Sequence, residues 1–518
     1  MNTEFLNHLG QRLRSPAFLA SLALALIWLV ALVFRLSDLA ARDLWTDEAW
    51  VALAALKSSP AAALTAGATT PPFYLLTVWA AAKLLGGQEW ALRSLSCAFG
   101  LGTLAVLWLL ARRLTSRPVA LLALAAVAVS PVLVYYAKEL KQYSGDAFFA
   151  VLVVYQAERL LASEGRRGWT ALGLSGLVGL GFSHPLIFYL LAVGVVLSLK
   201  QPAARGRLAF LSGLWLLTFA AAYLLIFRRT VDPELVAYFI QDYPDFSGLW
   251  PFIRWLGGAG YRYCCYFLGE WGVIWGPPLL LAGAYALWCG GRGRVLAYFG
   301  LPLLLTFGAA ALHRYPFMAN HGGNRLMLFT APLLYLVVAV GAGQALAWLW
   351  RGRGRWLAVA LTGVVLISLH PWANFRENLH PEMNREEISP LVARLEREIQ
   401  PRDWVYVYYF AKWPFAYYFQ GPSERLCLGK SCVETGLKLD PEEKPGRLWL
   451  IASHIPNLEH MRRFAGKLLG PGWQEIACYQ GEAAVLFCFY GPKATADANC
   501  PGPPQAAAAT LSDEKAVK

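Results

Sequence analysis

The stretch SLALALIWLVALVFRLSDLAARDLWTDEAW, residues 21–50, joins an apolar run to two adjacent carboxylates. The run covers about 16–36, and about 20 apolar residues are enough for a helix to cross a bilayer. Asp47 and Glu48 follow shortly after it, between Trp45 and Trp50. Carboxylates beside a membrane are costly unless they have a partner or a function. The stretch therefore predicts an uncleaved membrane anchor followed by a functional loop.

The composition indicates a polytopic membrane protein. The chain has 518 residues, of which 57% are hydrophobic and 15% charged, whereas soluble domains have about 25% charged residues. Further apolar runs lie at about 72–86, 92–111, 118–137, 146–163, 169–199, 207–227, 272–290, 295–312, 326–349 and 356–370. We expect about 11 to 13 transmembrane helices. The net charge of +13 comes largely from Lys and Arg in short loops, which favours membrane topology over nucleic-acid binding.

The basic residues also predict the orientation. Arg12 and Arg14 precede the first run and favour a cytoplasmic N-terminus. Basic clusters at 112–117, 166–167, 200–207, 292–294 and 351–355 are then cytoplasmic. The stretches left outside are 37–71, 138–145, 228–271, 313–325 and everything after 370.

Two runs are ambiguous. Run 72–86 is short and begins at Pro71–Pro72, so it either spans the membrane or is re-entrant or interfacial. Run 169–199 has the length of one strongly tilted span or of a tight hairpin with His184 at its outer tip.

The pattern changes after residue 370. Helical spacing at 384–399 and around 456–469 alternates with strand-like segments at 404–410, 447–453 and 483–491. We therefore predict a membrane domain over 1–370, a small extracytoplasmic α/β domain over 371–492 and a disordered tail over 493–518. No two cysteines have CxxC spacing, so no structural zinc is expected. Cys427–Cys432 or Cys478–Cys488 could form a disulfide in an extracytoplasmic domain.

The predicted topology collects unusual polar residues on one side of the membrane. The first outer loop carries Asp47 and Glu48. Later segments contribute Glu139, Lys141, Tyr143, His184 and Arg325. A carboxylate can deprotonate an acceptor hydroxyl or amine, while Lys and Arg can hold a phosphate. The combination suits transfer of a sugar from a lipid-phosphate carrier.

Several motifs occur in an order that resembles a known family. They are Arg35, the Asp47–Glu48 pair, PPFYLL at 71–76, a stretch ending at Arg93, SP…YYAKELKQY at 130–143, SHP at 183–185 and YPF…GGNRLMLFTAP at 315–332. The set resembles membrane glycosyltransferases of family 39, which include protein O-mannosyltransferases and lipid A aminoarabinose transferases. The resemblance covers about 30–490. It implies a GT-C fold in the inner (plasma) membrane, a polyprenyl-phosphate-sugar donor and an extracytoplasmic acceptor.

The resemblance also implies roles for individual residues. Asp47 is the expected general base, and Glu48 helps to shape the site. Glu139, Lys141 and Tyr143, with His184, are expected near the donor phosphate and sugar, and Arg325 is expected on the lipid phosphate. Lys141 stands where Arg is commoner in the family, and Thr69–Thr70 where relatives often have a charged residue or His. No obligatory cofactor is implied; a divalent metal on Asp47, Glu48 and His184 is the alternative.

Plainer interpretations remain open for these residues. Asp47 and Glu48 could pair with Arg42 at a helix start that has Thr46 as its N-cap. Trp45 and Trp50 are expected to be interface anchors.

At the level of the whole protein, the alternatives are a transporter or flippase for lipid-linked sugars, an O-antigen-ligase-like enzyme, and a non-catalytic scaffold. A transporter predicts inverted repeats or paired broken helices, and the sequence shows neither.

Overall fold

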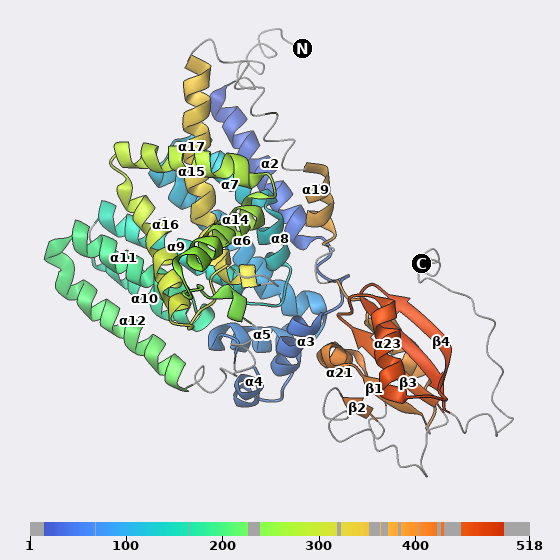
Figure 1. Cartoon of the computed structure of the whole chain (residues 1–518). Coiled ribbons are helices and arrows are strands. Elements are labelled where there is room, and N and C mark those ends of the chain that lie inside the picture. Colours follow the sequence, from blue (N-terminus) through green and yellow to red (C-terminus); the bar gives the residue numbers. More distant parts are fainter. Residues whose placement is uncertain are drawn as a thin grey trace, which may run out of the picture. The chain divides into compact units, whose positions relative to one another are not determined.

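The protein is a helical membrane region together with a small mixed β-sheet (Figure 1). The computed structural model describes residues 15–67, 69–163, 165–225, 239–318, 323–351, 363, 371–381, 385–401, 403–421, 426–428 and 447–491. The chain divides into two compact units. The first contains Met1–Ser37, Ala68–Val78 and Arg93–Pro381, and the second contains Asp38–Gly67, Trp79–Leu92 and Glu382–Lys518.

The membrane region is built almost entirely of helices. Its α-helices are α2 (Pro16–Leu36), α5 (Pro72–Leu85), α6 (Glu89–Leu114), α7 (Arg117–Val129), α8 (Pro131–Ala137), α9 (Tyr143–Ala162), α10 (Arg166–Phe182), α11 (Leu186–Lys200), α12 (Arg205–Leu225), α14 (Leu249–Leu268), α15 (Gly272–Cys289), α16 (Gly293–Ala311), α17 (Ala331–Arg351) and α19 (Pro371–Leu379). Short 3₁₀ segments are η1 (Pro202–Ala204), η3 (Ile240–Asp242) and η4 (Gly323–Thr330).

The expected count of 11 to 13 spans is too high for the described residues. Six helices there are long and apolar enough to cross a membrane, or seven if the bent pair α7 and α8 is one span. Several apolar runs of the sequence form shorter helices: α5 has 14 residues, α10 has 17 and α11 has 15. Helix α9 has 20 residues but carries Asp146, Glu158 and Arg159. Run 356–370 lies outside the described residues apart from Gly363.

Prolines divide two of the apolar runs. Pro131 follows the end of α7, and the chain bends by 59° into α8, because proline removes a helical donor and clashes with the preceding turn. The run 169–199 likewise forms two helices, α10 and α11, joined by Ser183–Pro185. Of its two interpretations, a pair of helices with His184 at the connection is therefore confirmed.

The packing of α15 against α17 depends on glycine. A β-carbon on Gly341 would collide with the carbonyl oxygen of Leu279, and one on Gly283 with that of Val337. Small residues allow two membrane helices to approach this closely, so these two glycines fix the contact.

The second unit combines the C-terminal sheet with the first loop of the chain. Its strands are β1 (Trp404–Val407), β2 (Leu426–Leu428), β3 (Arg447–Ser453), β4 (Gln474–Gly481) and β5 (Ala484–Tyr490). The strand order is β2-β1-β3-β5-β4. Strand β1 is parallel to β2 and β3, whereas β5 is antiparallel to β3 and β4. Three of these strands match the predicted segments, and β2 and β4 are additional.

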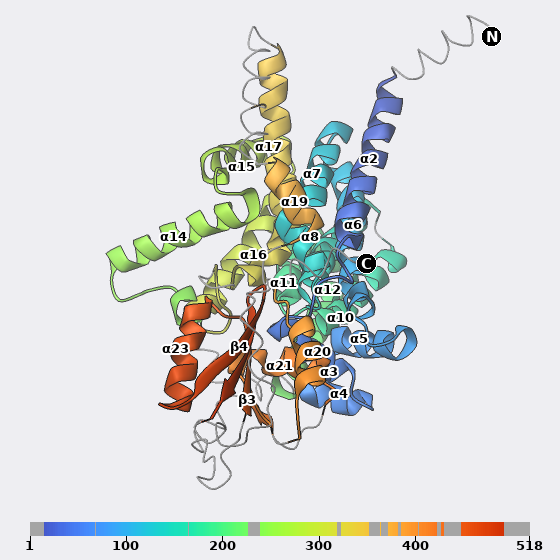
Figure 2. The same cartoon turned by 90° about the vertical axis from the view of Figure 1, so that its right-hand side faces the viewer.

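Helices cover both faces of this sheet. Helices α20 (Ser389–Glu398) and α21 (Lys412–Tyr418) pack on one face, and α23 (Leu458–Leu469) packs on the other (Figure 2). Strand β3 alternates accordingly, with Trp449 and Ile451 on the first side and Leu448 and Leu450 on the second. A central strand covered on both faces is apolar throughout, which is why RLWLIAS could be recognised from the sequence.

Residues 38–67 are anchored within the second unit by polar contacts. They contain α3 (Thr46–Ala55) and α4 (Pro60–Ala66). The Asp43 carboxylate accepts hydrogen bonds of 2.7 Å from both the backbone N–H and the hydroxyl of Ser389, at the start of α20. A carboxylate at a helix N-terminus satisfies backbone donors that have no partner in the helix. The backbone N–H of Leu44 also donates to the hydroxyl of Tyr418, at 2.8 Å.

Cys478 and Cys488 are free thiols on neighbouring strands, where Cys488 is paired with Ala477 and Cys478 with Phe487. They do not form the disulfide considered from the sequence. Cys432 and the predicted disordered tail 493–518 lie outside the described residues.

Candidate active site

The two adjacent acids of the first loop have different surroundings. Both lie in the first turn of α3, in the second unit. Glu48 is fully buried and its carboxylate lies 3.8 Å from the guanidinium of Arg42, which is also buried. The alternative interpretation, a pairing with Arg42, is therefore confirmed for Glu48. Asp47 lies within electrostatic range of Glu386 and His454 from the C-terminal part of the chain.

Two expectations for the surrounding residues are wrong. The N-cap of α3 is Trp45 rather than Thr46, and the Thr46 hydroxyl donates to the carbonyl of Phe410. Trp45 is buried and stacks on His454, with ring centroids 6.1 Å apart. Trp50 stacks on Trp413 at 6.3 Å. Trp45 is therefore buried inside the second unit instead of being exposed as an interface anchor, whereas Trp50 is only partly buried.

The first unit holds Glu139, Lys141, Tyr143, His184 and Arg325. The segment between α8 and α9 carries the first two, and Glu139 and Lys141 are both buried. Neighbouring Lys138 donates from Nζ to the carbonyl of Asn378 at 2.7 Å, near the end of α19. A cation there stabilises carbonyls left without a helical partner, so Lys138 holds this segment in place.

Tyrosine side chains bring Arg325 and Glu139 together. The Arg325 guanidinium lies 5.6 Å from the ring centroid of Tyr143, a cation–π distance. The Tyr143 ring meets that of Tyr136 edge to face at 5.1 Å. The hydroxyl of Tyr266 donates to that of Tyr136 at 3.2 Å.

The charges of Arg325 and Glu139 both act on the hydroxyl of Tyr266. Burial raises the pKa of its hydroxyl; the hydrogen bond to Tyr136 and the positive charge of Arg325 oppose that rise, and Glu139 adds to it. An arginine and a glutamate therefore lie near the same group of tyrosine rings. Sequence reasoning missed Tyr266 because nothing in the 228–271 stretch distinguishes it.

His184 is held by the segment that precedes PPFYLL. Its Nε2 lies 3.2 Å from the carbonyl oxygen of Thr69, so Nε2 carries the proton and donates. Burial lowers the pKa of His184 to about 4, and the hydrogen bond to Thr69 opposes the shift. His184 is therefore a neutral hydrogen-bonding group at neutral pH. It adds no positive charge to a phosphate site.

The PPFYLL motif also reaches the 138–143 segment. Tyr74 and Ser96 share a hydrogen bond of 2.7 Å, and the Ser96 hydroxyl donates to the carbonyl of Lys141 at 3.0 Å. Phe73 meets Phe182 edge to face at 5.9 Å. Three motifs that are distant in the sequence therefore converge in the first unit.

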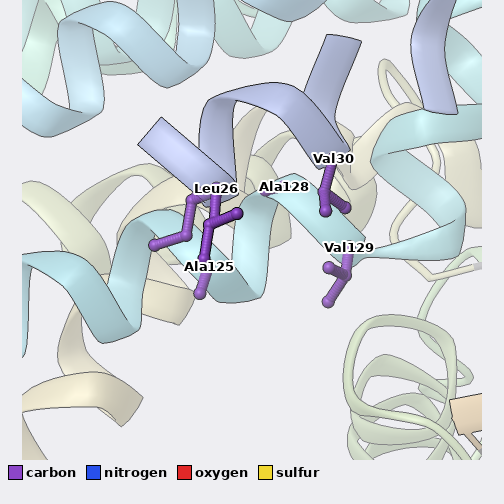
Figure 3. Close-up of a pocket in the computed structure, with 6 residues that line it drawn as sticks. Leu26, Val30, Ala125, Ala128 and Val129 are labelled. Atoms are coloured by element: carbon purple, nitrogen blue, oxygen red, sulfur yellow. The ribbon is translucent and has the colours of Figure 1, made fainter. Parts of the chain in front are cut away.

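One cavity contains none of these side chains. It has a volume of about 160 Å³ and is lined by apolar residues of α2 and α7: Leu26, Ile27, Val30, Ala125, Ala128 and Val129 (Figure 3). Such a lining offers no group for proton transfer or phosphate binding. Within the described residues, no group of three or more His, Cys, Asp or Glu side chains is arranged to hold a metal ion.

Comparisons with known proteins show a partial family match and a shared fold. Residues 69–229 match the profile of the dolichyl-phosphate-mannose-protein mannosyltransferase family. The fold is similar to that of ArnT from Cupriavidus metallidurans bound to undecaprenyl phosphate, with a TM-score of 0.55 and 15% identity over 92% of this chain and 98% of ArnT. Residues 69–229 therefore resemble this mannosyltransferase family, and the chain has the fold of ArnT. A comparison with curated proteins found no match.

Other solved structures share this fold. The apo form of the same ArnT has a TM-score of 0.51, with 15% identity over 92% of this chain and 98% of ArnT. The apo oligosaccharyltransferase of Archaeoglobus fulgidus has a TM-score of 0.50, with 11% identity over 84% of this chain and 69% of that protein. The chain is thus a multi-pass membrane protein that also has a small C-terminal sheet.

Proposed function

We propose that the chain is a glycosyltransferase that moves a sugar from a polyprenyl-phosphate donor to an extracytoplasmic acceptor, with Asp47 as general base. The observation that carries the donor assignment is the similarity over 92% of the chain to an ArnT structure that contains undecaprenyl phosphate. The family match over residues 69–229 supports it. That family's name describes a lipid-phosphate sugar donor of the same chemical class.

The side chains of the first unit suit the donor phosphate. Arg325 supplies a guanidinium, which grips phosphate oxygens through two parallel hydrogen bonds, and Lys141 supplies a point charge. Tyr143 orients Arg325 through its ring face. Glu139 balances the positive charge in the same tyrosine-lined region. Neutral His184 is suited to hydrogen bonding with a sugar hydroxyl.

The proposed reaction is a single displacement at the anomeric carbon. The Asp47 carboxylate takes the proton from the acceptor hydroxyl or amine as its oxygen or nitrogen bonds to that carbon. The bond from the carbon to the phosphate oxygen breaks, and both its electrons leave with the polyprenyl phosphate. Arg325 and Lys141 stabilise the charge that develops on this leaving group.

A release assay tests the donor and the base together. The full chain in lipid nanodiscs is supplied with undecaprenyl-phosphate-linked mannose, glucose or aminoarabinose and with bacterial membranes as acceptor, and free undecaprenyl phosphate is measured. We expect release from at least one donor, and a loss of at least 100-fold in Asp47→Asn, because removing a general base costs about 10²–10⁴ in rate. Asp245→Asn is the matched control, since Asp245 is an exposed loop acid. Release at the wild-type rate by Asp47→Asn would show that the base is another group.

Arg325 is tested through the concentration of donor that the enzyme needs. Arg325→Ala should raise the apparent KM for the donor at least tenfold, because a charge-assisted bond to phosphate contributes about 1.5–3 kcal/mol. Arg325→Lys should recover only part of this loss. Arg314→Ala is the control, since Arg314 is exposed in the sequence segment just before it. An unchanged donor KM in Arg325→Ala would remove Arg325 from the donor site.

A further inference from the structure

Three titratable side chains gather in the second unit although the sequence separates them widely. His454 Nδ1 lies 2.8 Å from a carboxylate oxygen of Glu386. Glu386 is almost fully buried, whereas 45% of the His454 side chain is exposed. Asp47 acts electrostatically on both. The cluster thus joins α3, the segment before α20 and the residue that follows β3.

The backbone of His454 is held in an uncommon conformation. Its φ is +58°, in the left-handed region that residues with a β-carbon usually avoid. Glycine would adopt this conformation without strain. A strained residue that keeps a functional side chain is grounds for a functional hypothesis.

Aromatic contacts hold the imidazole against the loop that carries Asp47. Trp45 stacks on the imidazole with ring centroids 6.1 Å apart and an interplanar angle of 22°, and Phe410 lies at 5.4 Å. Thr46, between Trp45 and Asp47 in sequence, donates its hydroxyl to the carbonyl of Phe410. The imidazole is therefore held by its hydrogen bond to Glu386 and by its ring contacts with Trp45 and Phe410.

The charges of the cluster favour a protonated imidazole. The hydrogen bond to Glu386 raises the pKa of His454, burial opposes the shift, and the negative charges of Glu386 and Asp47 add to it. An imidazolium beside Asp47 favours the ionised carboxylate in return. A general base must be ionised to accept a proton.

We infer that His454, oriented by Glu386 and stacked on Trp45, is a positioning residue that keeps Asp47 charged and aligned for proton transfer. This inference rests on the proposed role of Asp47 as the base. It extends the acceptor side of the site into the C-terminal sheet, through the end of β3. It also gives Trp45 a role within the site.

The electrostatic coupling can be tested without substrate. The full chain in nanodiscs is treated with diethyl pyrocarbonate, which modifies neutral imidazoles, across pH 5–9, and modification is measured for each histidine peptide by mass spectrometry. We expect the midpoint for His454 to move to lower pH in Asp47→Asn and in Glu386→Gln. The midpoint for His460, an exposed histidine on α23, should stay the same. An unchanged His454 midpoint in Asp47→Asn overturns the inference.

The effect of His454 on sugar transfer is tested with replacements that can adopt its positive φ. His454→Gly and His454→Asn both tolerate positive φ, so both variants should still fold. We expect at least a tenfold loss of transfer in both, with binding of undecaprenyl phosphate unchanged and the acid limb of the pH–rate profile moved to higher pH. Transfer within twofold of wild type in either variant overturns the inference. If the wild type releases no undecaprenyl phosphate, the proposed function fails. The substrate-free coupling test still measures whether Asp47 and His454 interact, so failure of the inference and failure of the proposed function can be told apart.

Discussion

At the scale of single residues, the two adjacent acids of the first loop have different neighbours. Successive residues of a helix point about 100° apart, so Asp47 and Glu48 face different neighbours. Glu48 is buried with Arg42, and Asp47 is near His454 and Glu386. The sequence predicted that these acids matter and named Arg42 as a partner. It could not reveal His454, because nothing local marks a histidine about 400 positions away.

Substitution of the two acids should separate folding from chemistry. Glu48→Gln leaves the buried Arg42 charge without its carboxylate and should destabilise the protein by about 3 kcal/mol. Asp47→Asn should leave stability nearly unchanged while abolishing transfer. Thermal unfolding of the two variants in the same detergent measures the difference. Equal losses of stability in both would mean that both acids are structural.

His454 should also make stability depend on pH. Its pKa is raised in the folded protein above the ordinary value of 6.5. The corresponding stabilisation is fully present below pH 6.5 and is lost as the pH rises through the folded pKa. We expect the melting temperature of the full chain to fall across this range, and the fall to be smaller in His454→Asn. A fall of the same size in His454→Asn would assign it to other groups.

At the scale of elements, apolar runs in the sequence predicted helices and strands better than polar or short segments did. Strands β1, β3 and β5 were predicted because their residues are mostly buried. Strand β4 was missed because most of its residues are only partly buried or exposed, and such an edge strand has no strong pattern. For run 169–199, a break near His184 was one of the two predicted possibilities. The bend at Pro131, within run 118–137, was not predicted.

The contact between α15 and α17 gives a prediction at this scale. Gly341→Val places a side chain against the backbone of Leu279, which cannot move aside as a flexible side chain could. Overpacking costs about 1–3 kcal/mol even where side chains can adjust, so we expect poor yield and a lower melting temperature. Gly300→Val is the control, because no atom lies within 4 Å of a β-carbon at Gly300. Equal yields from the two variants would contradict this account of the packing.

At the scale of the whole molecule, the division into units does not follow the sequence. Residues 38–67 belong with the C-terminal sheet, and the bond from Ser389 to Asp43 joins positions 346 apart. Hydrophobic periodicity is a local signal, so it located both segments but not their association. The motifs of the candidate site were found by their order, yet that order does not reveal that Asp47 belongs to one unit and Arg325 to the other.

The orientation of the molecule in the membrane is the last prediction. The positive-inside rule places basic loops in the cytoplasm, which leaves the candidate site and the second unit outside. Single cysteines are introduced in a cysteine-free background at His460, exposed on α23, and at Arg166, exposed at the start of α10. A membrane-impermeant maleimide added to intact cells should label position 460 and leave position 166 unlabelled until the cells are opened. Because Asp47 and α23 lie in the same unit, labelling of position 460 only from the cytoplasm would require the acceptor to be cytoplasmic as well.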